Sequence, residues 1–333
     1  MLKKATKIFL ALALSVVMCV AFTACGGGDS EDSGEATTTE TVNMVMGTGG
    51  TSGSWYTVGG VMCGALSNSD MINATAQTSA GGVENIRLVS SNERQLGFCM
   101  PSLVIYAQEG IESFEGDQIE NIRAIAQFMP MQAHFIVRDG SDIQTIEDLK
   151  GKAIGTGAAG SGDEVMCREI LKAVGLTYDD VDEQLLSFAE QVTAFKDNQL
   201  DAMFMLASAP TSAVLDAASQ ADCRLLSIEG DLQAQILEEY PYYYETVIPA
   251  DAYDFIDEDV TTIGISTLLF TNAEMADDVV YEVCNQLFEE NNLTAIQESH
   301  VAMADFTAET ALEDMVVDLH PGAAKWYEEQ GLK

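Results

Sequence analysis

Two glycine-rich stretches of this sequence carry residues of the kind that bind anions through the main chain. The first reads GTGGTSGSWYTVGG over 47–60, and the second reads GTGAAGSGDE over 155–164. Each follows a short apolar run and precedes a helix-like stretch, so each loop would present the unpaired amides of a helix N-terminus. Because these amides carry a partial positive charge, either loop could hold a carboxylate or a phosphate.

The second loop has the spacing GxGxxG at Gly155, Gly157 and Gly160, which also occurs in dinucleotide-binding folds. Asp179 and Asp180 lie about 20 residues further on, where such folds place an acid for the ribose. The motif alone is weak, and it lies in the middle of the chain. We therefore favour a small carboxylate as the ligand. A dinucleotide is one alternative, and glycines needed only for the turn geometry are another.

Hydroxyl groups accompany the glycine amides in both loops. The loop residues that we expect to contact the ligand are Gly49, Thr51, Ser52, Ser54, Gly160, Ser161 and Gly162. Ser161 and the two glycine amides beside it are the strongest candidates for the ligand carboxylate. Asp163 is expected to be the N-cap of the following helix. If it faces the ligand instead, it would repel a carboxylate unless the ligand also carries an amine or a cation lies between them.

Residues 1–24 show the three parts of a secretory signal peptide: a start with three lysines, an apolar run and a small-residue cleavage site. Thr23 and Ala24 before Cys25 resemble a bacterial lipobox, which implies a lipid thioether on Cys25; an ordinary secretory signal is the alternative. The stretch 25–40 is rich in Gly, Ser, Thr and acids, so we expect a flexible tether. The protein is thus expected to be lipid-anchored at the outer face of the cell membrane.

The composition is strongly acidic, with 53 acidic residues against 15 basic ones. Removal of the three signal-peptide lysines leaves 12 basic residues and a formal net charge of about −41. Nucleic acid is not expected as a partner, because phosphate binding needs a basic face. The acidity is typical of a solvated surface that keeps a secreted protein in solution.

Cysteine and histidine usage gives little support for metal or redox chemistry. Five cysteines follow Cys25, none of them in a CxxC pair, so we expect buried thiols rather than disulfides or zinc ligands. With three histidines in the chain, neither a metal nor another cofactor is predicted. GxSxG and HExxH are missing, so we expect a binding protein rather than an enzyme. A secreted hydrolase, or a nucleotide-binding enzyme that uses the loop 155–164, is the alternative.

The pattern along the chain predicts an α/β protein with two lobes. About 290 residues follow the tether, which is more than a single core usually holds. Strand-like and helix-like segments alternate, and 122–128 and 133–138 are predicted as two separate strands. We expect lobe 1 to comprise 41–135 with 250–333, and lobe 2 to comprise 136–249.

Five stretches, in order along the chain, resemble the TAXI family, the TRAP-associated extracytoplasmic solute receptors. They are GTGGTSGSWYTVGG (47–60), ATAQTSAGGVENIRL (74–88), SDIQTIEDLKGKAIGTGAAGSGDEV (141–165), LSFAEQVTAFKDNQLDAMFMLASAP (186–210) and LHPGAAKWYEEQG (319–331). The resemblance implies a type II periplasmic-binding-protein fold with a ligand cleft between two lobes. It also implies a receptor that delivers an organic acid or an amino-acid anion such as glutamate to the membrane permease subunits of a TRAP transporter.

The resemblance adds further candidates for the ligand site. Tyr56 matches the second of the family's paired aromatic residues, whereas Trp55 replaces the first and is expected in the core. Gln77 and Asn85 fall on amide-bearing positions, although Asn85 could instead brace its lobe. The remaining candidates, from the other loops, are Ser79, Met100, Ser102, Ser208 and Pro210.

The predicted site departs from the family's pattern at three places. Gly82 stands where a serine is common, the triplet 100–102 replaces a more polar one, and Asp163 stands where a threonine usually follows GSG. Because these departures fall within the predicted site, the family's substrates do not transfer directly to this chain.

Overall fold

The structure is a computed structural model that describes residues 41–313 and 315–333. The predicted signal peptide, Cys25 and most of the tether lie outside these residues. The strands in the described part are β1 (Val42–Gly47), β2 (Ile72–Gln77), β3 (Leu96–Cys99), β4 (Ile122–Arg138), β5 (Ala153–Gly155), β6 (Asp182–Gln184), β7 (Ala202–Ala207), β8 (Cys223–Leu226), β9 (Tyr244–Ile248) and β10 (Val260–Asn272).

The helices of the described part alternate with these strands over most of the chain. They are α1 (Ser54–Leu66), α2 (Gly82–Ser90), α3 (Pro101–Glu109), α4 (Gly162–Ala173), α5 (Phe188–Lys196), α6 (Ser212–Ala218), α7 (Gly230–Glu239), α8 (Asp277–Phe288), α9 (Glu290–Glu298) and α10 (Pro321–Glu329). The expected α/β class is therefore confirmed.

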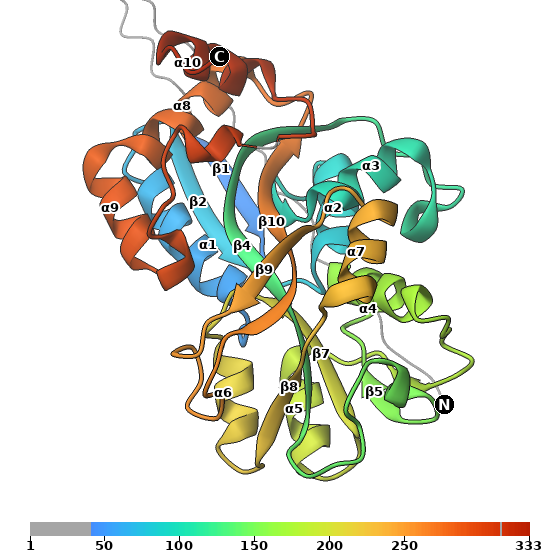
Figure 1. Cartoon of the computed structure of the whole chain (residues 1–333). Helices are drawn as coiled ribbons and strands as arrows, with labels where there is room; N and C mark the ends of the chain where they lie inside the picture. The colour runs from blue at the N-terminus through green and yellow to red at the C-terminus, as the bar shows by residue number, and fades with distance from the viewer. Residues whose placement is uncertain (1–40, 314) are drawn as a thin grey trace, which may run out of the picture. The chain divides into compact units, whose positions relative to one another are not determined.

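One continuous sheet joins two lobes of the described chain. Its strand order is β2-β1-β3-β10-β4-β7-β5-β6, with β8 paired to β4 and β9 paired to β10. Lobe 1 contains β1–β3 with α1–α3 and α8–α10, and lobe 2 contains β5–β8 with α4–α6 (Figure 1). In lobe 1, β1 lies parallel to both β2 and β3, and in lobe 2, β5 lies parallel to both β6 and β7.

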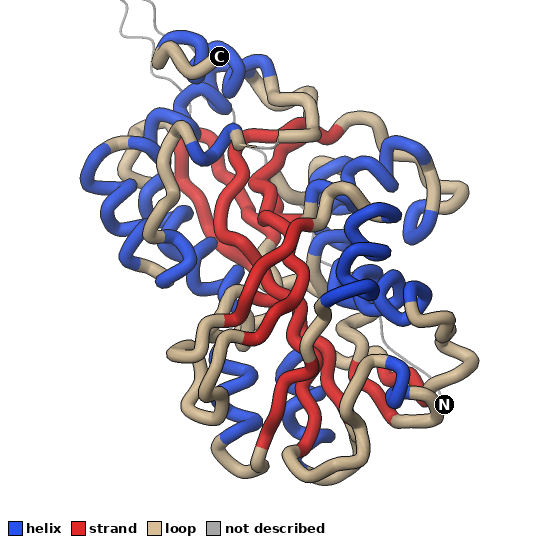
Figure 2. Tube along the Cα trace, viewed as in Figure 1, coloured by secondary structure: helices blue, strands red, loops and turns tan. Residues whose placement is uncertain are grey.

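The strands β4 and β10 run from one lobe to the other, as the continuous red traces in Figure 2 show. The first part of β4 pairs antiparallel with β10, and its last part, from Gln132 onward, pairs with β7 and β8. The beginning of β10 pairs with β9. The lobes are thus linked by hydrogen-bonded strands rather than by loops alone.

The expectation of two separate strands at 122–128 and 133–138 is wrong, because β4 continues through both. The sequence suggests a break since Pro130 cannot donate a main-chain hydrogen bond. The strand accommodates it with a bulge: Met129 has a φ of 41°, and the register with β10 shifts between Ser266 and Thr267.

Apolar residues fill both faces of the sheet. On one face of lobe 1, side chains of β1 such as Met44 and Met46 pack with α1, α8 and α10. On the other face, the buried residues of α2, α3 and α4 belong to a single apolar cluster, so this core runs from lobe 1 into lobe 2. The five cysteines of the described chain are free and buried, as predicted.

Candidate functional site

A cavity of about 200 Å³ lies where the two glycine loops meet. Both lobes contribute to its wall. The lining residues are 49–55, 79–81, Met100 and Met131 from lobe 1 and the crossing strand β4, and Ala158, Gly162, Asp163, 187–189, Leu206 and Ala207 from lobe 2. The sequence prediction that both loops face one site agrees with this placement.

The first loop leaves the N-terminus of α1 open toward the cavity. Gly53 is the N-cap in an extended conformation, and no side chain of the described residues caps the helix there. The turn before it is closed by the Gly53 N–H, which donates to the Gly50 carbonyl at 3.0 Å. Ser52, Gly53 and Ser54 all line the cavity, so unpaired amides at the start of α1 are available to an anionic ligand.

The second loop, in contrast, satisfies its own helix. Ser161 is the N-cap of α4, with φ −95° and ψ 160°, and its Oγ accepts from the Glu164 N–H at 3.3 Å. The expectation that Asp163 caps this helix is therefore wrong, since Asp163 already lies in the first helical turn. Ser161 is buried and, like Gly160, is not among the residues that line the cavity.

Asp163 faces the cavity and braces the sheet at the same time. Its Oδ1 accepts from the Leu206 N–H on β7 at 2.9 Å. Of the described residues that line the cavity, Asp163 alone carries a charged side chain. Burial raises the pKa of its carboxyl from 3.8 to about 6, because removal from water disfavours the charged form.

Of the two neighbouring aromatic residues of α1, Trp55 rather than Tyr56 lines the cavity, although Trp55 also packs against the core as predicted. Trp55 lines the cavity, donates its Nε1–H to Thr267 Oγ1 at 3.0 Å and packs edge-on against Phe98. Tyr56 has 37% of its surface exposed and is outside the cavity wall. Successive helix residues point about 100° apart, so the choice between them depends on the rotational setting of α1, which the sequence pattern does not fix.

Phe188 of α5 forms part of the opposite wall, although it was not among the site residues predicted from the sequence. A Cβ added at Gly53 would lie 3.7 Å from the Phe188 ring, so the first loop directly faces this residue. Phe188 lies in the stretch 186–210 that resembles the TAXI family, and its aromatic type next to a helix start was the available signal.

Asn85 has a bracing role in lobe 1. It is buried, its amide donates to the Thr48 and Phe98 carbonyls at 2.7 and 2.9 Å, and its Oδ1 accepts from Arg94 at 3.1 Å. It lies outside the cavity wall, so the structure agrees with the bracing alternative.

Four other predicted residues also lie outside the cavity wall: Gln77, Ser102, Ser208 and Pro210. The Gln77 side chain is exposed at the end of β2. Ser102 and Ser208 are buried, and the Ser208 hydroxyl donates to the Pro130 carbonyl. Predicted residues that do line the cavity are Gly49, Thr51, Ser52, Ser54, Ser79, Met100, Gly162 and Asp163.

Main-chain and hydroxyl contacts join the two lobes around the cavity. The Ser212 hydroxyl of α6 donates to the Ser52 carbonyl at 2.7 Å. On the other side, the Glu84 N–H of α2 donates to the Gly160 carbonyl at 3.3 Å. Each glycine loop is therefore hydrogen-bonded, through one of its backbone carbonyls, to a helix of the opposite lobe.

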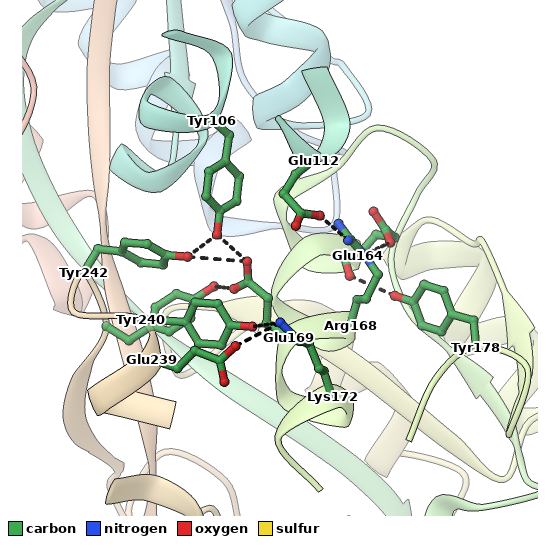
Figure 3. Close-up of polar contacts among 11 residues, drawn as sticks. Tyr106, Glu112, Glu164, Arg168, Glu169, Lys172, Tyr178, Glu239, Tyr240 and Tyr242 are labelled. Carbon is green, nitrogen blue, oxygen red and sulfur yellow. Dashed lines mark hydrogen bonds and ion pairs between the residues drawn. The ribbon is translucent and has the colours of Figure 1, made fainter. Parts of the chain in front are cut away.

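A second set of contacts between the lobes surrounds Glu169 of α4 (Figure 3). The Tyr106 hydroxyl of α3 donates to Glu169 Oε1 at 2.6 Å, and Tyr242 and Tyr243 also donate to this carboxylate. Burial raises the pKa of Glu169, whereas the tyrosine hydrogen bonds lower it. The preceding residue, Arg168, pairs with Glu112 of lobe 1. We call Tyr106, Glu169, Tyr242 and Tyr243 the tyrosine cluster.

Comparison with known proteins assigns the family. Residues 46–331 match the sequence profile of the NMT1-like family. The chain belongs to the NMT1-like family. The narrower assignment of this NMT1-like chain to the TAXI receptors is not part of that match and stays a prediction.

Solved structures resemble the NMT1-like chain in fold. One from Bordetella bronchiseptica RB50 has a TM-score of 0.54 at 15% identity, covering 87% of this chain and 98% of that one. One from work on glutathione import via GshT and the cystine ABC importer TcyBC of Streptococcus mutans has a TM-score of 0.50 at 10% identity, covering 79% and 95%. The fold is that of the two-lobed type II periplasmic-binding proteins, as the sequence predicted.

A third similar structure is the alkanesulfonate-binding protein SsuA from Xanthomonas axonopodis pv. citri bound to MOPS, with a TM-score of 0.47 at 14% identity over 87% of this chain and 93% of that one.

Within residues 41–313 and 315–333, no helix of the NMT1-like chain combines the length and apolar character that crossing a membrane requires.

Proposed function

We propose that this NMT1-like protein is an extracytoplasmic solute receptor of the TAXI type, anchored through lipidated Cys25. It would capture a small organic acid or amino-acid anion and deliver it to the permease subunits of a TRAP transporter. Lobe 1 would comprise 41–135 with 250–333, and lobe 2 would comprise 136–249. The observation that carries this proposal is a cavity walled by both lobes, into which the uncapped N-terminus of α1 opens.

Main-chain amides would be the anion-binding groups, since no lysine, arginine or histidine is among the described residues of the cavity wall. The amides at the start of α1 combine unpaired N–H groups with the positive end of the helix dipole. The hydroxyls of Thr51, Ser52 and Ser54 lie on the same loop and can add hydrogen bonds to a carboxylate.

The rest of the cavity favours a small and partly apolar solute. Trp55, Met100, Met131, Phe188 and Leu206 supply apolar surface. The volume of about 200 Å³ is below the roughly 300–1,000 Å³ of pockets that enclose drug-sized ligands. A dinucleotide is much larger than this space, so the GxGxxG of the second loop fits a turn beside a small-solute site better than a nucleotide cradle.

The contacts between the lobes support a mechanism in which closure and binding are coupled. Ligand contacts to both loops exist only when the lobes are together, so the ligand would shift the population toward the closed form by that difference in affinity. The structural neighbour from the Streptococcus mutans glutathione import work supports the broader assignment to solute uptake.

Native mass spectrometry of the purified mature chain, followed by thermal shifts with amino acids, dicarboxylates, keto acids and short-chain acids, tests the proposal. One acid class should raise the melting temperature in proportion to the logarithm of its concentration. Thr51→Ala should weaken that shift, whereas Thr57→Ala, an exposed threonine of α1 outside the cavity wall, should leave it unchanged. A stabilising nucleotide, or no stabilising acid in the whole panel, would contradict the proposal.

A further inference from the structure

The cavity wall carries two chemically different polar groups. At the start of α1, unpaired main-chain N–H groups favour negative charge. On the side of α4, Asp163 presents the one carboxyl group among the described lining residues. A ligand in contact with both groups therefore meets N–H donors at the start of α1 and an acid on the side of α4.

The carboxyl group of Asp163 has neutral partners within the described chain. It accepts from the Leu206 N–H at 2.9 Å, from its own main-chain N–H and from the Ser161 hydroxyl. Among the ion pairs of the described residues, none includes Asp163; the nearby Arg168 is taken by Glu164 and Glu112. An acid without a cationic partner in a largely apolar wall either becomes neutral or acquires a cation from elsewhere.

The hydrogen bonds of Asp163 do not by themselves require a charged side chain. The helix cap is already supplied by Ser161, and Glu164 already places a carboxylate in the first turn, where it interacts favourably with the helix dipole. The hydrogen bond to Leu206 could equally be accepted by the amide oxygen of an asparagine, which carries no charge. What an aspartate adds here is a negative charge that faces the ligand space.

We propose that Asp163 selects a ligand that carries an ammonium group together with its carboxylate, and that this zwitterion is bound in preference to the plain organic acid. The ligand carboxylate lies at the amides of α1, the ammonium donates to Asp163, and an apolar or short side chain lies against Trp55 and Phe188. This inference rests on the proposed receptor function and narrows its ligand class to α-amino acids and close analogues.

The test compares three forms of one carbon skeleton: the amino acid, the acid without its amine, and the amine without its acid. Calorimetric titration of the mature chain at pH 7.5 with such triplets, built on alanine, leucine, methionine and glutamate, gives the affinities directly. We expect at least one amino acid to bind tenfold or more tightly than its deaminated acid. The proposal is overturned if the best-binding acid equals or exceeds its amino acid.

A charge-neutral variant tests the residue itself. Asp163→Asn keeps an acceptor for the Leu206 N–H, so the sheet contact can persist. Its affinity for the amino acid should fall at least tenfold while its affinity for the deaminated acid is unchanged or higher. Glu183→Gln makes the same charge change at a carboxylate of lobe 2 outside the cavity wall and should change neither affinity. Equal loss of both ligands in Asp163→Asn, or no loss of the amino acid, contradicts the proposal.

The outcomes separate this inference from the proposed function. If plain acids bind tightly and amino acids do not, the receptor function stands and the role of Asp163 is refuted. If no member of any triplet binds, both the receptor function for small acids and the selection by Asp163 are refuted.

Discussion

The hydroxyl of Tyr106 on α3 donates a 2.6 Å hydrogen bond to the carboxylate of Glu169 on α4, so lobe 1 and lobe 2 are joined by a tyrosine and an acid. Glu169 is buried, with 5% of its surface exposed, and its other partners in the tyrosine cluster come from the segment between α7 and β9. Separation of the lobes would break the Tyr106 bond and expose the acid to water. The tyrosine cluster is therefore expected to favour the closed arrangement.

Tyr106→Phe should lower the free energy of unfolding by about 1–3 kcal/mol, because it removes a buried hydrogen bond to an acidic group. It should also increase the radius of gyration of the ligand-free chain. Urea unfolding and small-angle X-ray scattering measure the two effects. Tyr281→Phe is the matched control, since it removes an exposed 2.7 Å bond from Tyr281 to Glu329. Equal effects in both variants would argue against a role of the tyrosine cluster in closure.

Trp55→Phe should weaken ligand binding by about 10-fold, because the smaller ring leaves part of the cavity wall without contact to the ligand and the hydrogen bond to Thr267 is lost. Tyr56→Phe should leave binding unchanged, because Tyr56 lies outside the wall. Titration of both variants with the same ligand is the measurement. A larger loss of affinity in Tyr56→Phe than in Trp55→Phe would instead support the sequence-based prediction that Tyr56 contacts the ligand.

Gly81→Ala should weaken binding by hindering closure. Gly81 has a φ of +124°, and a Cβ there would lie 3.2 Å from the Ser161 Cβ of lobe 2. An alanine at this position would strain the backbone and would also crowd Ser161 of the other lobe, so both effects oppose closure. Gly60→Ala, an exposed position of α1 where an added Cβ has no neighbour within 4 Å, should retain full affinity. We would measure both affinities and the melting temperatures of the ligand-free chains; an unchanged affinity in Gly81→Ala would contradict the expected closure.

Asp163 should make the ligand-free chain less stable as the pH rises. Its pKa is about 6 in the folded chain against 3.8 unfolded, so the folded state binds the proton more tightly. Stability is therefore lost between about pH 4 and pH 6, by at most ~3 kcal/mol. Cys167, one turn along α4, does not titrate there, because burial raises its pKa well above the usual value.

Urea unfolding of Asp163→Asn and the wild type at pH 4 and pH 7.5 checks this expectation. The variant should become more stable than the wild type only at the higher pH. Asp180→Asn gives the opposite sign, since hydrogen bonds from Lys150 and Thr177 lower the pKa of Asp180 and stabilise the folded chain above pH 4. A difference that does not vary with pH in Asp163→Asn would show that the carboxyl has an ordinary pKa.

The sequence was sufficient to predict the α/β class and the meeting of the two glycine loops, because glycine spacing and the alternation of strands and helices are local patterns. The roles of Ser161 and Asp163 were not predictable in the same way. Both residue types are good N-caps, and only the backbone conformation decides which one precedes the first helical turn.

Which residues reach the cavity wall also depends on the directions of their side chains, and the linear sequence does not contain these directions. Trp55 and Tyr56 differ by one position, yet only Trp55 faces the cavity. Gln77 has a suitable amide, but it lies at the exposed end of β2. Residues contributed by distant segments, such as Met131 and Leu206, are apolar and look like ordinary core residues until the fold brings them to the wall.

The bulge in β4 connects the ligand space to the strands that join the lobes. Trp55 donates to Thr267 Oγ1, and the Thr267 hydroxyl in turn donates to the carbonyl of Met129, the bulged residue, at 3.2 Å. Two hydrogen bonds thus lead from the aromatic wall to the place where the β4–β10 ladder is already irregular. A solute that displaced the Trp55 indole would therefore strain these two hydrogen bonds, at the point where the β4–β10 ladder is already irregular.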